Sequence, residues 1–255
     1  GVAGIVVYGD FDKCLQTNSF KPLVRICNGK ILHDENGDAC FPLDKRPEQI
    51  VKEAIEYFHT EFGCRIFNLS VGDRDHLYCG GRQFPWAEML DQLAREKDIV
   101  IVISAGNVGN PELKEFTSRE QLMEQCRDQL FFQEHRLIDP ATSALGITVG
   151  SITRFDEPSA IPSRTTRISV GKKDYLSVFT RIGKGVNKAV KPDLVDYGGN
   201  YAVSQMMRGR NQWVINDMRL VEPTLNNGND KIFRGYCGTS FSAPHVTHIA
   251  ARIER

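Results

Sequence analysis

The chain has 255 residues, of which 41% are hydrophobic and 25% charged, and its 32 basic side chains balance 32 acidic ones. These proportions are those of an ordinary globular protein and exclude a disordered or fibrous chain. The length fits one large domain or at most two. With zero net charge and no basic stripe, a nucleic-acid partner is not expected. No apolar run approaches the ~18 residues that a membrane span requires, so no membrane partner is expected either.

Seven cysteines are spread irregularly along the chain, at positions 14, 27, 40, 64, 79, 126 and 237. There is no Cys-x-x-Cys pair and no Cys/His spacing typical of zinc, so we expect no metal site. The odd number and uneven spacing favour free thiols and a cytoplasmic protein. Secretion stays open, because the chain begins at Gly1 and shows no leader segment.

The N-terminal part contains a run of hydrophobic pattern at 2–8 that is too short to distinguish a buried helix from a buried strand. Residues 22–27 are predicted to form a strand. A helical stripe of apolar residues follows from Pro47 to about Phe62 and ends at a glycine suited to a C-cap. Residues 65–70 are predicted to form a short strand.

A second helix is predicted from Pro85 to about Lys97, followed by a nearly continuous apolar strand at 99–104. Strands of this kind are buried on both faces of a parallel sheet. Helices and strands alternate over residues 47–104, and 146–152 is predicted as a further strand. This alternation predicts a doubly wound α/β fold, with a mostly parallel central sheet flanked by helices.

The first candidate motif, Gly-Thr-Ser-Phe-Ser-Ala-Pro-His at 238–245, places Ser240 where a helix begins. The backbone N–H groups of a first helical turn are unsatisfied, and the helix dipole there stabilises negative charge. A serine at this point could act as a nucleophile with an adjacent site for an oxyanion. Taken alone, the pattern is more typical of an ordinary helix N-cap preceded by a turn glycine.

The second and third motifs follow two of the predicted strands. Ser-Ala-Gly-Asn-Val-Gly occupies 104–109, where the Asn107 amide could donate a hydrogen bond to an oxyanion. Asn-Leu-Ser-Val-Gly occupies 68–72 and could offer backbone groups to an extended peptide. Each is, by itself, also an ordinary strand-to-loop transition, where Gly and Asn are common.

In this order, the three motifs resemble those of the subtilisin-like serine peptidases, the subtilases. Ser240 matches the nucleophile of the family and Asn107 its oxyanion-hole amide, with Phe241 where methionine is more usual. Pro-Ala-Thr at 140–142, leading into 147–150, and Lys-Pro-Asp-Leu at 191–194 fit as well. The resemblance extends over nearly the whole chain and is loose between 153 and 230. It implies a subtilisin-like fold and a serine endopeptidase (EC 3.4.21.-) whose partner is a peptide or protein substrate.

The resemblance also implies a set of residues that flank the substrate and line the pocket for the residue before the cleaved bond. These are Ser70, Val71, Gly72, Ser104, Ala105, Gly106 and Thr239. No cofactor is implied. Calcium binds many relatives, but no Asp/Asn-rich loop here can be named as a site.

A subtilase serine needs a histidine base and an orienting aspartate. The family pattern His-Gly-Thr-Gly-Val-Ala-Gly-Ile overlaps residues 1–5, which implies a helix at 2–8 and a catalytic histidine three residues before Gly1. None of the six histidines present lies in a His-Gly-Thr context, and His245 corresponds to a structural position. We therefore expect 1–255 to be a single peptidase domain that lacks the segment with the catalytic Asp and His. We also expect it to be cut at its C-terminus and inactive alone.

Two other functions stay open: a catalytically dead subtilase fold used as a binding or regulatory module, and an unrelated α/β protein such as a nucleotide binder. No glycine-rich phosphate loop of standard spacing supports the second. Residues 111–136 are predicted to be a helical insertion, with a helix from Ser118 to about His135. It would be either a solvated helix or a docking surface for a partner domain. Cys237 would be a packed small residue or, alternatively, a redox-sensitive thiol.

Overall fold

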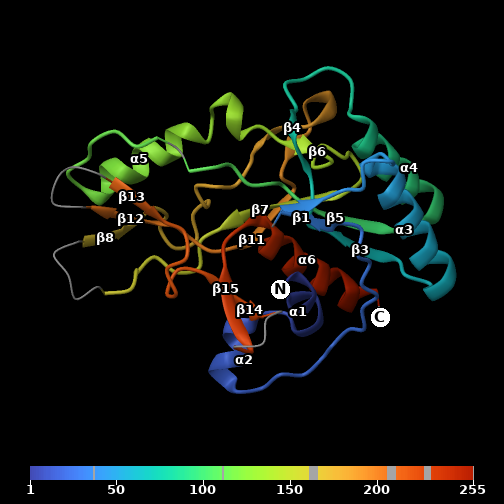
Figure 1. The fold of residues 1–255 in the computed structure, drawn as a ribbon, viewed down its shortest axis with the longest axis horizontal. Helices are drawn as coiled ribbons and strands as arrows, with labels where there is room; N and C mark the ends of the chain where they lie inside the picture. The colour runs from blue at the N-terminus through green and yellow to red at the C-terminus, as the bar shows by residue number, and fades with distance from the viewer. Residues whose placement is uncertain (37, 111, 161–165, 206–210, 227–230, 255) are drawn as a thin grey trace.

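The structure is a computed structural model and describes residues 1–36, 38–110, 112–160, 166–205, 211–226 and 231–254. At its centre lies a parallel four-stranded sheet in the order β11 (Leu194–Tyr197), β7 (Ile147–Ile152), β5 (Val100–Ser104) and β3 (Ile66–Leu69). Helices cover both faces of this sheet (Figure 1). The α/β fold predicted from the sequence is therefore confirmed.

One face of the sheet packs against two helices, α3 (Pro47–Phe62) and α4 (Pro85–Lys97). Alternate residues of a strand point to opposite faces. Ile101 and Ile103 of β5 point to this face and join the buried residues of both helices in one core. Both helices have the predicted bounds because the local signals agree with the packing. Each has proline in its first turn, and Gly63 ends α3 in the left-handed conformation at φ 64°.

The other face is covered by α6 (Thr239–Ile253), which crosses the strands, and by α1 (Val2–Tyr8), which lies beside it (Figure 1). Val102 of β5 and Val149 of β7 meet Ala243 and Val246 of α6 in a small buried cluster. The helix expected at residues 2–8 is thus observed. The first turn of α6 lies at the carboxyl end of the sheet, which places Ser240 there.

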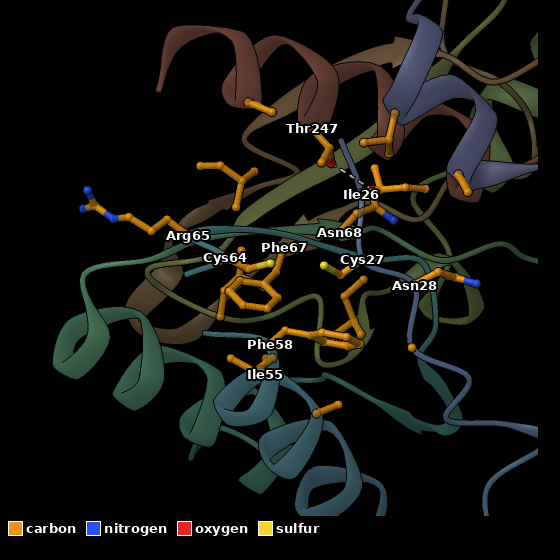
Figure 2. Close-up of a pocket in the computed structure, with 18 of the residues that line it drawn as sticks. Ile26, Cys27, Asn28, Ile55, Phe58, Cys64, Arg65, Phe67, Asn68 and Thr247 are labelled. Atoms are coloured by element: carbon orange, nitrogen blue, oxygen red, sulfur yellow. Dashed lines mark hydrogen bonds between the residues drawn. The ribbon is translucent and has the colours of Figure 1, made fainter. Parts of the chain in front are cut away.

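The strand expected at 22–27 is wrong: this segment has no regular structure. It faces β3 across a cavity of about 430 Å³, in which Cys27 on one side faces Cys64 on the other (Figure 2). A strand needs a hydrogen-bonded neighbour, and the free edge of β3 lies on the other side of this cavity. The only backbone hydrogen bond made by 22–27 among the described residues runs from Leu23 N–H to Val7 O.

A second layer surrounds a three-stranded antiparallel sheet of β8 (Thr166–Ser169), β12 (Ala202–Gln205) and β13 (Asn211–Val214). The predicted polar helix is shorter than expected, running as α5 (Arg119–Gln129) from an N-cap at Ser118. Its Leu122 and Cys126 join the core of this layer. The remaining elements are α2 (Phe11–Thr17), β1 (His33–Glu35), β2 (Asp38–Cys40), β4 (Asp73–Leu77), β6 (Ile138–Asp139), β9 (Gly183–Lys184), β10 (Val190–Lys191), β14 (Glu222–Leu225), β15 (Phe233–Tyr236), and the 3₁₀ turns at Gln133–His135 and Val186–Lys188. Among the described ranges, every helix is too short or too polar to cross a bilayer.

Candidate active site

Ser240 lies in the first turn of α6, against the loop that follows β3. Its Oγ donates a hydrogen bond to the carbonyl oxygen of Ser70 at 3.4 Å. In return, Ser70 Oγ donates to the carbonyl oxygen of Ser240, also at 3.4 Å. That carbonyl is free to accept because Pro244, four residues later, has no N–H with which to close the helical bond. The proline of the motif therefore helps to hold the serine against the 70–72 segment.

Asn107, just after β5, is fixed by the residue before the serine. Its Oδ1 accepts from the backbone N–H of Thr239 at 2.9 Å and from Thr239 Oγ1 at 3.2 Å. A backbone N–H can only donate, so the atom that faces it must be the amide oxygen. The Nδ2 group consequently points the other way, toward Gly238, where an added Cβ would come within 3.0 Å of it.

Two hydrogen-bond donors at this point have no acceptor among the described residues. One is Asn107 Nδ2 and the other is the backbone N–H of Ser240. The neighbouring N–H groups of the turn are both used, that of Thr239 by Asn107 and that of Phe241 by Gly238 O. A pair of free donors at a helix N-terminus is the arrangement that stabilises a developing oxyanion.

The two proposed substrate segments meet at Thr239. Its Oγ1 accepts from the backbone N–H of Gly106 at 3.1 Å, which joins the 104–106 segment to the nucleophile turn. Across the site, Asn68 Nδ2 donates to Ser70 Oγ at 2.9 Å, and Asn68 Oδ1 accepts from Thr247 on α6. Both segments are therefore held by side chains of α6.

The structure thus brings together the predicted nucleophile Ser240, the predicted oxyanion amide of Asn107 and both predicted substrate segments. Their exposure differs. Ser70, Val71, Gly72 and Gly106 are half-buried, whereas Ser104 is nearly buried and Ala105 fully so. Ala105 can offer a substrate only its backbone. Thr239 is also fully buried, so it acts through Asn107 and Gly106 rather than by direct contact.

Comparison with known proteins decides the family. The sequence model of the Subtilase family matches residues 1–255, the full length of the chain. The chain belongs to the subtilase family.

One relative, the "Uncharacterized protein y4bN" of Sinorhizobium fredii (strain NBRC 101917 / NGR234), is 36% identical over 212 residues, covering 81% of this chain and 47% of its own. Among solved structures, the prenylagaramide maturation protease PagA is similar with a TM-score of 0.46 and 18% identity, over 88% of this chain and 52% of its own. The self-cleaved protease domain of PatA gives a TM-score of 0.43 and 17% identity, over 80% of this chain and 50% of its own. The chain spans about half the length of these relatives.

No described histidine of this subtilase is hydrogen-bonded to Ser240. His245, five positions along the same helix, points to the opposite side, where its Nε2 lies 3.6 Å from Glu222 Oε1. His248 Nδ1 bonds to the carbonyl oxygen of Val6, and its ring packs against Gly9. His248 thus fastens α6 to α1, whereas the buried Nε2 of His245 has no hydrogen-bond partner among the described residues. Neither histidine is placed to act as the base.

A buried cluster of charged residues behind α6 was not predicted from the sequence. Arg154, directly after β7, makes a bidentate ion pair with the fully buried Glu222 and a second ion pair with Asp10. Its guanidinium also lies over the Tyr197 ring, 4.1 Å from the centroid. Burial would raise the pKa of Asp10, but the charge and hydrogen bond of Arg154 outweigh it and hold that pKa low. The ion-pair partners of Arg154 are 68 residues away (Glu222) and 144 residues away (Asp10), so no local signal in the sequence reveals them.

Cys237, three residues before Ser240, is partly buried and packs against the core of the second layer. Its Sγ donates to the carbonyl oxygen of Asn200 at 3.2 Å, and burial raises its pKa to about 12. The described residues contain no group of three or more His, Cys, Asp or Glu that could hold a metal ion.

Proposed function

We propose that this subtilase is a serine endopeptidase that cleaves peptide bonds through an acyl-enzyme on Ser240. The observation that carries the proposal is the pair of free donors, Asn107 Nδ2 and the Ser240 N–H, beside the Ser240 hydroxyl. Attack by Ser240 Oγ on a peptide carbonyl moves charge onto the carbonyl oxygen, and these donors would hold it. Collapse would expel the amine and leave an ester on Ser240, which water then cleaves.

The base that takes the proton from Ser240 is proposed to lie on polypeptide outside residues 1–255. Ser240 Oγ donates to the Ser70 carbonyl, an acceptor that cannot remove the proton. A serine hydroxyl is a weak nucleophile without an adjacent base. Residues 1–255 alone would accordingly be nearly inactive. Loss of the triad costs about 10⁶-fold in turnover in a subtilisin, where binding and the oxyanion hole retain about 10³–10⁴-fold over water.

The cavity beside β3 supports this proposal because it could receive such a segment. It is bounded by 24–29 on one side and 63–69 on the other, and it is closed by residues of α3 and α6 (Figure 2). β3 hydrogen-bonds to β5 at one edge and leaves its other edge to this cavity. A strand inserted here would extend the sheet and end near Ser70. In the full-length protein Cys27, exposed in this structure, would then react more slowly with a maleimide than the exposed Cys79.

The test is labelling with a fluorophosphonate, which reacts with activated serines. Three proteins are compared: the full-length protein from its natural start, the same protein with Ser240→Ala, and the 255-residue chain. The proposal expects labelling of the first alone. A folded full-length protein that is not labelled would instead indicate a catalytically dead subtilase fold used for binding.

A further inference from the structure

Arg181 is a buried cation that lies against the segment carrying Asn107. It is 6% exposed, and its guanidinium makes no ion pair with a carboxylate among the described residues. It donates instead to three backbone carbonyl oxygens, from Nε to that of Asn107 at 3.2 Å and from Nη1 to those of Glu134 and Arg136 at 2.7 and 2.8 Å. Burial and the like charge of Arg74 both lower the pKa of Arg181. The charge of this side chain is therefore hydrogen-bonded but not neutralised.

An unneutralised charge in a protein interior is unfavourable, because it has lost its water and gained no counterion. Arg154, buried behind α6, meets this cost with the carboxylates of Glu222 and Asp10. Arg181 has no such partner in the described ranges, and carbonyl dipoles leave its net charge in place. Since charge is weakly screened in the interior, its positive potential extends to the neighbouring backbone. Its presence beside the candidate active site therefore calls for a reason.

The segment with Asn107 is bound to Arg181 along its backbone. Asn107 and Thr180 form an antiparallel bridge, and the N–H of Arg181 donates to the carbonyl oxygen of Gly106 at 3.2 Å. The guanidinium bond to the Asn107 carbonyl adds a side-chain contact to this pairing. Thr239 holds the amide end of Asn107, so Arg181 and Thr239 fix opposite ends of one residue. The direction of Asn107 Nδ2 therefore depends on both.

The other side of the guanidinium holds the turn formed by residues 133–136. Nη1 bridges two carbonyl oxygens of this turn, at 2.7 and 2.8 Å. The turn ends the segment 111–136, which the sequence predicts as an insertion. Arg181 thus joins this segment to the backbone of Asn107, and it links the position of the amide to a part of the chain outside the three motifs.

We propose that Arg181 is a positioning residue for the oxyanion site, which fixes the backbone of Asn107 and supplies a positive charge that favours an oxyanion there. The inference rests on the proposed function, because it takes Asn107 Nδ2 and the Ser240 N–H as the donors to that oxyanion. The fixed backbone keeps Nδ2 aimed, and the positive charge acts on negative charge that appears only in the transition state. Arg181 should therefore affect kcat and leave KM nearly unchanged.

The experiment compares the full-length protein with its Arg181→Gln variant, which keeps a polar side chain and removes the charge. Removal of an oxyanion donor itself costs about 10²–10³-fold in kcat, so loss of a residue that acts through the donor should cost less, about 10-fold. Steady-state kinetics on one peptide substrate would measure kcat and KM separately. A variant with the kcat of the wild type, or one whose KM rises as much as its kcat falls, would overturn the proposal.

Arg181→Lys separates the charge from the hydrogen bonds and is the less disruptive variant. A lysine keeps a positive charge but not the planar fork that reaches three carbonyls. Its kcat should lie between those of the wild type and Arg181→Gln at pH 7. Because burial lowers the pKa of an ammonium group, this advantage over Arg181→Gln should disappear as the pH rises to about 10. Equal kcat values for the two variants at pH 7 would show that the charge has no part and would overturn the proposal.

Arg167→Gln is the matched control. Arg167 lies in β8 of the second layer, where it pairs with the buried Asp217 at 2.9 Å. Its loss should lower the free energy of unfolding in urea and leave kcat and KM unchanged. A fall in kcat as large as that of Arg181→Gln would show that lost stability explains the kinetics, against the proposal.

A binding measurement separates this inference from the peptidase proposal, because it needs no reaction. A peptide that ends in a carboxylate is compared with the same peptide ending in an amide, by calorimetry at pH 8. The carboxylate should bind the wild type more tightly, and Arg181→Gln should weaken its binding about 10-fold and that of the amide little. This result would support the role of Arg181 even in a full-length protein that a fluorophosphonate does not label. Equal losses for both peptides would indicate a purely structural role and overturn the proposal.

Discussion

Thr239 holds Asn107 by both of its donors: the backbone N–H at 2.9 Å and the hydroxyl at 3.2 Å reach the same Oδ1. The hydroxyl also accepts from the N–H of Gly106 at 3.1 Å. One buried threonine therefore orients the amide of Asn107, the proposed oxyanion donor, and holds the 104–106 segment that precedes it. The residue before the nucleophile has a structural reason to be a threonine, which its place in a motif does not reveal.

Thr239→Val tests this role. The substitution keeps the shape, removes the hydroxyl and leaves the Gly106 N–H without its acceptor. A buried hydrogen bond contributes about 0.5–1.5 kcal/mol, so kcat of the full-length protein should fall about 3- to 10-fold. Thr239→Ser keeps the hydroxyl and should retain most of the activity. Steady-state kinetics of both variants would check this, and a valine variant as active as the wild type would contradict the role.

Asn107→Ala removes the donor itself. The expected loss in kcat is about 10²–10³-fold, the magnitude established for removal of this kind of amide in a subtilisin, with KM nearly unchanged. KM should stay nearly constant because Asn107 Nδ2 would stabilise charge that appears only in the transition state. Equal losses in substrate affinity and kcat would indicate instead that Asn107 binds the ground state. Circular dichroism of the variant controls for folding, since its Thr239 N–H loses a buried acceptor.

The elements with strong local signals were predicted well, and those that depend on distant partners were not. α3 and α4 carry proline at their starts and an apolar stripe, so their bounds followed from the sequence. Residues 22–27 have the composition of a strand, but their partner is not beside them. β8, β12 and β13 are held together by pairing between segments that the sequence left unassigned. At the site, the three motifs located Ser240 and Asn107. The packing of Ile138 beside Gly72 and Gly106 could not be predicted, because it joins three segments that are distant in the sequence and adjacent only in the fold.

Asp139 should make stability depend on pH. Burial raises its pKa to about 6 from an ordinary 3.8, although its carboxylate accepts from the Ala87 N–H at 3.0 Å. The folded state therefore favours the protonated form. Protonated Asp139 therefore contributes up to about 3 kcal/mol to the free energy of unfolding. This contribution is fully present below about pH 4 and is lost as the pH rises through about 6. His76 and Asp73, which also face this carboxyl group, act in opposite directions.

Asp139→Asn keeps an oxygen acceptor for the Ala87 N–H and removes the titration. Urea unfolding of the full-length protein between pH 4 and 7 should show a flatter stability profile for this variant than for the wild type. Asp75→Asn, at an exposed position of β4, is the control and should leave the profile unchanged. A parallel profile for wild type and Asp139→Asn would show that another group is responsible.

Cys237 should be unreactive despite its place three residues before the nucleophile. With a pKa of about 12, only about one thiol in 10⁴ is ionised at pH 8, and the thiolate is the reactive form. Cys126, which is buried and whose pKa burial raises to about 12, should behave in the same way. Iodoacetamide at pH 8 followed by peptide mass spectrometry should modify the exposed Cys79 in the folded protein and reach Cys126 and Cys237 only in denaturant. Alkylation of Cys237 in the folded protein, with loss of fluorophosphonate labelling, would restore the redox-sensitive interpretation of this thiol. Unchanged fluorophosphonate labelling after Cys79 is modified would show that the Cys79 thiol is not needed for the chemistry of Ser240.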